Sequence, residues 1–205
     1  MAIDKTAVIG FPVDHSLSPI IHNHWIKELA LDIKPYEKLN VDPNMFEEQM
    51  NNLKAEGFGG INVTVPLKEL AFNISDETSN VSKKLRSANT LTLSSDKINA
   101  DNTDAVGFIN SLDKKTIEEN ITNKKTLVLG AGGSARSVVH ALNELGSQVR
   151  LFNRTPEKAA ILLNDLSINS SPVSTEELDD YANSSSFIVN TVSYTHLTLP
   201  TIYSV

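Results

Sequence analysis

Cysteine is absent from this chain of 205 residues, and tryptophan occurs only once. Without cysteine there is no disulfide framework, no thiolate nucleophile and no cysteine-ligated metal site, so the composition favours a cytoplasmic protein. Long apolar runs are also lacking. None approaches the roughly 20 residues that span a bilayer, and the start Met1–Lys5 has no signal-peptide character. We therefore expect neither secretion nor membrane insertion.

An excess of positive charge is lacking too. The chain carries 18 basic and 25 acidic residues, a formal net charge of −7. Nucleic-acid binders need clustered cations to neutralise phosphates, so DNA and RNA are not expected as partners. With 40% hydrophobic and 21% charged residues, the chain can fold as one large or two small globular domains.

Strand-like and helix-like segments alternate through the first half of the chain. Thr6–Gly10 is a β-branched run stopped by glycine, which predicts a buried strand. Ser18 followed by Pro19 predicts an N-cap and a first helical residue, and apolar residues then recur at helical spacing. The other expected elements are extended segments at 36–41, 60–63 and 90–93, and helices at 43–56, from about 66 and from about 105. This alternation is typical of a parallel sheet.

The second half begins with a complete βαβ unit. Its predicted strand 124–129 turns through glycines into a helix at 134–145, and a strand follows at 148–152. A further helix at 158–166 and a strand at 186–190 extend the pattern. We predict an α/β protein in which an N-terminal α/β domain over 1–103 precedes an incomplete doubly wound, or Rossmann, domain over 104–192.

The glycine turn has the pattern of a dinucleotide site. It reads G-x-G-x-x-A, with a predicted strand before it and a predicted helix after it, and consists of Gly130, Ala131, Gly132, Gly133, Ser134 and Ala135. Gly130 allows the tight turn, Gly132 lets the backbone approach a pyrophosphate, and the helix N-terminus offers free N–H groups. The alternative is a glycine-rich turn that binds no ligand.

The residues after the next strand indicate which dinucleotide would bind. An NAD enzyme usually has an acidic residue here, whereas this sequence has Asn153, Arg154 and Thr155. Arg154 can bind a 2′-phosphate through charge-assisted hydrogen bonds, and Lys158 lies one helical turn further on. These residues predict NADP as the cofactor. The alternative is that Arg154 and Lys158 merely solvate the start of a helix.

Polar clusters stand where strands of the first half meet loops, which is where an α/β sheet forms its binding crevice. They are Ser16-Leu17-Ser18, Asn62 to Lys68, Ser87-Ala88-Asn89-Thr90 and Asp101-Asn102-Thr103-Asp104. Each has a purely structural alternative: a serine before proline can be a helix cap, Lys68 an exposed lysine at a helix start, and Asp104 an N-cap.

Taken together and in order, these clusters resemble the shikimate dehydrogenase family, whose pattern S-x-S-P, N-V-T-x-P-x-K, A-N-T, N-T-D, G-A-G-G-x-A and N-R-T recurs from about Thr6 to Thr191. The resemblance implies NADPH-dependent, reversible reduction of 3-dehydroshikimate to shikimate in aromatic amino acid biosynthesis. It assigns the substrate carboxylate to Ser16 and Ser18, the ring hydroxyls to Asn62, Thr64, Asn89 and Asp104, and catalysis to the pair Lys68 and Asp104. A quinate/shikimate dehydrogenase-like paralogue and an inactive NADP- or metabolite-binding fragment are the alternatives.

The five histidines show no spacing typical of a metal site, and we predict none. Partners other than small molecules are not indicated, and monomer and homodimer both stay open. From about Ser193 to Val205 no motif of the family is recognisable. We expect this segment to be non-native and the family pattern to be truncated there, which would leave the chain unstable or inactive unless the remainder is restored.

Overall fold

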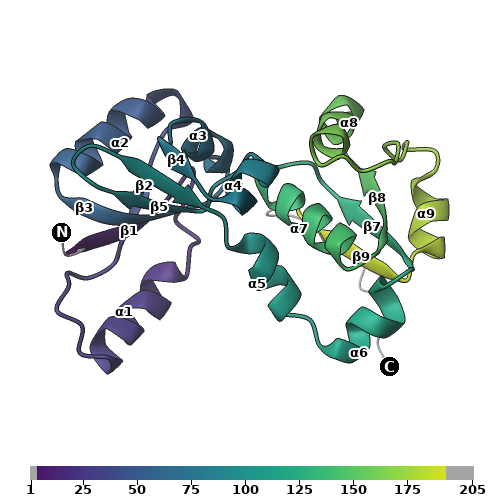
Figure 1. The fold of residues 1–205 in the computed structure, drawn as a ribbon, viewed down its shortest axis with the longest axis horizontal. Coiled ribbons are helices and arrows are strands. Elements are labelled where there is room, and N and C mark those ends of the chain that lie inside the picture. Colours follow the sequence, from purple (N-terminus) through teal and green to yellow (C-terminus); the bar gives the residue numbers. More distant parts are fainter. Residues whose placement is uncertain (1–3, 193–205) are drawn as a thin grey trace.

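The computed structural model describes residues 4–192, which form two lobes that lie side by side in Figure 1. The first lobe contains a six-stranded sheet and the second a three-stranded sheet, and helix α5 (Asp104–Asn110) begins the second lobe. Within these residues, no helix is long and apolar enough to cross a membrane.

The first sheet has the strand order β2-β1-β3-β5-β6-β4. Its strands are β1 (Lys5–Gly10), β2 (Glu37–Asn40), β3 (Phe58–Val63), β4 (Glu77–Thr78), β5 (Thr90–Leu93) and β6 (Ile98–Asp101). The helices of this lobe are α1 (Ser18–Glu28), α2 (Phe46–Ala55), α3 (Lys68–Asn73) and α4 (Asn80–Leu85), with a 3₁₀ turn at Pro43–Met45. Each predicted element of this half is present, with ends shifted by a few residues.

The expectation of a parallel first sheet is wrong in part. Strands β1, β2 and β3 are parallel, but β5 runs antiparallel to both β3 and β6. The reversal matters because Asn62, near the end of β3, pairs with Thr90 at the start of β5. In a wholly parallel sheet the residues before β5 would lie at the opposite edge from those after β3. The antiparallel strand brings both groups to one edge.

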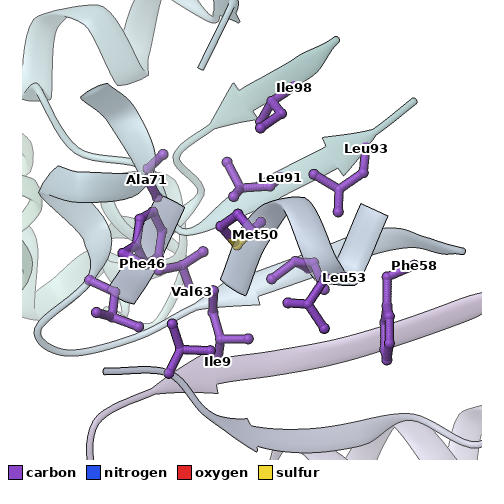
Figure 2. Close-up of a cluster of buried hydrophobic side chains, with 14 of the residues drawn as sticks. Ile9, Phe46, Met50, Leu53, Phe58, Val63, Ala71, Leu91, Leu93 and Ile98 are labelled. Atoms are coloured by element: carbon purple, nitrogen blue, oxygen red, sulfur yellow. The ribbon is translucent and has the colours of Figure 1, made fainter. Parts of the chain in front are cut away.

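The core of the first lobe lies between this sheet and α2 (Figure 2). Phe46, Met50 and Leu53 are spaced by four and three residues, so they share one face of α2. All three are buried against strand residues such as Ile61 and Leu91. Burying each of these side chains contributes roughly 1.5 to 3 kcal/mol. This packing makes the sheet a rigid base for the loops at its edge.

Helix α1 forms where its proline and periodic apolar residues predict it, but it has no buried residue. Ile20, Trp25 and Leu29 are all more than half exposed in the described structure. Its apolar contact is made by the partly buried Ile26, which packs against Val8, Val13 and Tyr36. Its other contacts with Tyr36 are polar and aromatic: Asn23 hydrogen-bonds to the backbone, and the ring of His22 stacks on the tyrosine ring.

The second lobe contains the predicted βαβ unit. Its sheet has the order β8-β7-β9, all parallel, and comprises β7 (Lys125–Leu129), β8 (Gln148–Phe152) and β9 (Phe187–Asn190). The helices are α6 (Lys114–Thr116), α7 (Gly133–Glu144), α8 (Pro156–Asp165) and α9 (Leu178–Ser184), with a π-helical turn at Ile117–Ile121. One hydrophobic cluster joins α5, α7 and α8 and includes Leu85 from α4. The lobes therefore share packed apolar surface.

Candidate functional site

A cavity of about 670 Å³ opens at the edge of the first sheet where β3 ends and β5 begins. The substrate residues implied by the family resemblance all line it, and they are Ser16, Ser18, Asn62, Thr64, Lys68, Asn89 and Asp104. Residues from widely separated parts of the sequence meet here. The fold thus brings this whole set together, whereas the individual roles of its members stay predictions.

Lys68 and Asp104 form an ion pair at the end of the cavity nearest the second lobe. The Nζ of Lys68 donates to Asp104 Oδ2 at 2.6 Å, and the lysine residue is only 7% exposed. The alternative of an exposed lysine at a helix start is therefore wrong. Asp104 is the first residue of α5 and not its cap, because Thr103 occupies the cap position; the Asp104 N–H donates to the side chain of Asn102. A buried ammonium held by a carboxylate can donate a proton to a ligand in the cavity, and the amine formed in that step can take one back.

Ser16 and Ser18 stand at the N-terminus of α1. The prediction that Ser18 caps this helix is wrong, because Ser18 is its first residue, Leu17 is the cap position and no side chain caps it there. The Ser18 N–H instead donates to Ser16 Oγ at 3.3 Å. Both serines line the cavity, next to the positive end of an 11-residue helix. That position favours an anionic group of a ligand.

Several cavity residues escaped the sequence prediction. His15 and His22 line the cavity, and Tyr36 donates from its hydroxyl to Asn62 Oδ1 at 2.7 Å. Burial lowers the pKa of His22 and raises the pKa of Tyr36. Tyr36 lies 26 residues before Asn62, and no local motif connects the two. The only available signal was that Tyr36 begins the predicted extended segment at 36–41.

A second cavity, of about 320 Å³, lies over the glycine turn. It is lined by most of the predicted cofactor residues, which are Gly130, Ala131, Gly132, Asn153, Arg154, Thr155 and Lys158. Gly130 has a φ of +103°, and a β-carbon there would lie 2.7 Å from Thr191 Oγ1, so the turn requires glycine. A β-carbon at Gly132 would meet nothing within 4 Å, which leaves the backbone open to a ligand.

Arg154 and Lys158 are exposed at the rim of this cavity. Within residues 4–192, neither side chain forms an ion pair or a hydrogen bond. The site offers a turn with accessible backbone and two cations, which is the donor set that a pyrophosphate and a 2′-phosphate require. These residues therefore fit NADP.

Gly133, Ser134 and Ala135, the other three predicted turn residues, do not line the second cavity, and their roles toward a cofactor stay predictions. Ala135 is fully buried in the core of the lobe. Gly133 faces Lys68, and a β-carbon there would lie 3.3 Å from the lysine Cβ and 3.5 Å from its Cδ. The hydroxyl of Ser134 lies 3.5 Å from Lys68 Nζ. The start of α7 thus borders the ion pair of the first lobe.

A cluster of charged residues also joins the lobes, and the sequence did not indicate it. Asp165, at the end of α8, pairs with Arg136 of α7 at 2.9 Å and with Arg86 of the first lobe at 3.1 Å. Arg136 extends to Glu69, the neighbour of Lys68, at 3.4 Å. The side chains of Arg136 and Asp165 are about nine-tenths buried. The described residues contain no group of three or more acidic or histidine side chains that could hold a metal ion.

Both halves of the chain are similar to known protein families. Residues 8–91 match the shikimate dehydrogenase substrate binding domain, and residues 111–201 match the shikimate / quinate 5-dehydrogenase family. The second match extends past Ser193, into the segment set apart above, which lies outside the described residues. The curated shikimate dehydrogenase (NADP(+)) of Methylocella silvestris is 36% identical over 192 residues, which are 94% of this chain and 68% of that protein.

Two solved structures are similar over 93% of this chain and 69% of their own. Shikimate dehydrogenase from Aquifex aeolicus has a TM-score of 0.82 and 36% identity. Shikimate 5-dehydrogenase from Thermus thermophilus, in complex with NADP(H) and shikimate, has a TM-score of 0.76 and 30% identity. This chain spans about two thirds of the length of these relatives.

Proposed function

Because this chain belongs to the shikimate dehydrogenase family, we propose that it binds shikimate and NADP and interconverts shikimate and 3-dehydroshikimate. The observation that carries the proposal is the ion pair of the buried Lys68 with Asp104, which lines the polar cavity of the first lobe and borders the glycine turn of the second. The reaction would serve aromatic amino acid biosynthesis.

In this proposal one lobe binds the substrate and the other binds the cofactor. Residues 1–103 form the substrate-binding domain, and residues 104–192 form the NADP-binding domain. Support comes from the strands, since all those of the six-stranded sheet precede Asp104 and all those of the three-stranded sheet follow it. The cofactor, when bound, supplies or accepts the hydride, and the protein residues manage orientation and the proton.

Lys68 is the proton-transfer residue in this mechanism. Its ammonium donates a proton to the carbonyl oxygen of 3-dehydroshikimate during reduction, and the neutral amine takes the proton from the shikimate hydroxyl during oxidation. Asp104 holds Nζ through Oδ2 while its Oδ1 accepts from the amide of Asn89 at 2.8 Å. Both carboxylate oxygens are thus engaged, which fixes the direction in which the ammonium points.

The remaining cavity residues orient the substrate. Ser16 and Ser18, at the positive end of α1, receive the carboxylate, and the ring hydroxyls face Asn62, Thr64 and Asn89. Arg154 and Lys158 bind the 2′-phosphate of NADP. The described cavities thus contain side chains for both roles, the orientation of the substrate and the binding of the 2′-phosphate.

Steady-state rates of the full chain with shikimate and with quinate, each with NADP and NAD, test the proposal. We expect the highest kcat/KM for shikimate with NADP. A higher kcat/KM with quinate would favour the paralogue, which the family description shikimate / quinate 5-dehydrogenase keeps as the second candidate. Binding of shikimate and NADP without turnover would favour a non-catalytic binding protein.

A further inference from the structure

A chain of hydrogen bonds runs along the wall of the first cavity, from Asp104 to Tyr36. Asn89 Nδ2 donates to Asp104 Oδ1 at 2.8 Å, and Thr90 Oγ1 donates to Asn89 Oδ1 at 2.9 Å. Asn62 Nδ2 then lies 3.5 Å from Thr90 Oγ1, and the Tyr36 hydroxyl donates to Asn62 Oδ1 at 2.7 Å. Asn62 and Asn89 line the cavity, whereas Tyr36 lies behind them and is buried.

The orientation of the Asn89 amide is dictated by its neighbours. An ionised carboxylate can only accept, so the Asn89 atom that faces Asp104 must be the NH₂ group. A backbone N–H can only donate, and the N–H of Thr103 points at the other side of the amide at 3.0 Å. The carbonyl oxygen of Asn89 must therefore face Thr103.

The orientation of the Asn62 amide is likewise determined by its neighbours. Because Thr90 donates its single hydroxyl proton to Asn89 Oδ1, its oxygen can act only as an acceptor toward Asn62. Asn62 accordingly turns its NH₂ group toward Thr90 and its carbonyl oxygen toward Tyr36. The second proton of that NH₂ group is left for a ligand in the cavity. The amide of Asn62 thus has one orientation that satisfies every neighbour.

Contacts outside this series of hydrogen bonds also hold Tyr36 in place. Its backbone N–H donates to Asn23 Oδ1 at 2.7 Å, its backbone carbonyl accepts from Asn23 Nδ2, and its ring stacks on the ring of His22 at 4.2 Å between centroids. Burial raises the pKa of Tyr36, so its hydroxyl stays protonated and remains a donor. The phenol group therefore reaches Asn62 from a fixed base.

We propose that Tyr36 is a positioning residue that holds the Asn62 amide with its NH₂ group toward the cavity, so that the site selects a substrate oxygen that accepts a hydrogen bond. The inference rests on the proposed function, since it names how that same cavity recognises shikimate. Thr90 holds the Asn62 amide from its other side. Asp104, which can only accept, determines the donor-to-acceptor direction of every hydrogen bond in the series.

Tyr36→Phe removes the hydroxyl and keeps the ring that stacks on His22. We expect a rise of roughly 3- to 10-fold in the shikimate KM and in the calorimetric Kd of shikimate, with kcat within about twofold and KM for NADP unchanged. The matched control is Tyr181→Phe in α9, whose ring lies against Arg150 of the second lobe. We expect it to match the parent in every constant.

The background of Asn62→Ala separates positioning from general packing. If Tyr36 acts through Asn62, then Tyr36→Phe has no further effect on the Kd once the amide is gone. Thr90→Val should weaken shikimate binding in the same way as Tyr36→Phe, and Thr90→Ser should restore it.

The outcomes distinguish this inference from the proposed function. A parent chain that binds no shikimate contradicts both. A parent that binds shikimate, together with a Tyr36→Phe variant of equal Kd and KM, contradicts the inference alone. An undiminished effect of Tyr36→Phe in the Asn62→Ala background also contradicts it, because the tyrosine would then act on the fold and not on the amide.

Discussion

In the first lobe the charged groups of the cavity are already paired, whereas in the second lobe the cations stand at the cavity rim alone. Lys68 is buried and pairs with the half-buried Asp104, and the amide of Asn89 donates to the second carboxylate oxygen. Arg154 and Lys158 are exposed and, in the described part of the chain, unpaired.

This difference follows from the ligands that the two sites are proposed to bind. A reacting ketone needs a proton donor that is fixed before the ligand arrives, so its orientation is built into the protein. A phosphate brings its own two negative charges, so the protein only has to leave cations and N–H groups free for it. The first cavity is organised by its own residues, and the second is completed by its ligand.

Replacing Lys68 is expected to have the largest effect. Lys68→Ala removes the proton-transfer group from the paired site, and we expect kcat to fall by about 100- to 10,000-fold while the Kd of NADP stays the same. Turnover assays and calorimetry on the same preparation measure the two quantities. Lys83→Ala, in α4, removes an exposed lysine as the matched control. Turnover that survives in Lys68→Ala would remove the lysine from the mechanism.

The charged cluster between the lobes should give the next largest effect, because its buried charges form one of the contacts that join the lobes. Asp165→Asn leaves the buried Arg136 with only its longer contact to the exposed Glu69, and we expect the free energy of unfolding to fall by about 3 kcal/mol. Urea denaturation measures the change. The control is Glu144→Gln, which breaks the exposed pair with Lys84 and should cost less than about 1 kcal/mol. Equal losses in the two variants would contradict a special role for Asp165.

Replacing Arg154 tests whether the exposed cation at the rim of the second cavity binds the 2′-phosphate. Arg154→Ala should raise the KM for NADP by about 10- to 100-fold, because a charge-assisted pair with the 2′-phosphate is lost. The KM for NAD, which has no such phosphate, should stay the same and acts as the internal control. A similar loss with both cofactors would show that Arg154 supports the fold of the turn and does not recognise the phosphate.

The smallest expected effect is a pH dependence of the free energy of unfolding that arises from His140 in the second lobe. Burial and the nearby charge of Lys84 lower the pKa of His140 and outweigh the opposing charge of Glu144. The folded protein therefore takes up this proton less readily than the unfolded chain does, and stability is lost as the pH falls through about 6.5. Urea denaturation at about pH 7 and pH 5.5 should show this loss, and His140→Gln should reduce it. An unchanged slope in the variant would exclude His140 as its source.

The features that the sequence predicts well are local ones. The residues of the glycine turn, of the pair of cations after β8 and of the pair of serines at the start of α1 are each close together in the sequence, and short motifs predict them. The features that it does not predict depend on contacts between distant segments. The pairs Tyr36–Asn62 and Arg136–Asp165 join residues 26 and 29 positions apart, and no periodicity connects them.

The expectation of a parallel first sheet failed, and two short elements were missed, for identifiable physical reasons. Alternating strands and helices predict a parallel sheet, but β5 and β6 are joined by a short turn at Ser94–Lys97, which only an antiparallel pair can use. Strand β4 has two residues and α4 has six, so neither is long enough to produce a periodic pattern. Helix α1 was predicted from apolar periodicity, yet Ile20, Trp25 and Leu29 are exposed, and Ile26 packs near Tyr36 beside the polar His22 and Asn23.

Gly133 has a consequence for how this protein could be recombined. The glycine stands against the alkyl chain of Lys68, so a side chain at this position of the second lobe would require the lysine of the first lobe to shift by a few tenths of an ångström. A nucleotide-binding unit grafted from a different dehydrogenase, with alanine or serine at this position, would push against the lysine even if its own fold and cofactor binding were intact. Engineering a new cofactor lobe onto this substrate lobe therefore has to match one backbone position at the seam as well as the loops that touch the ligands.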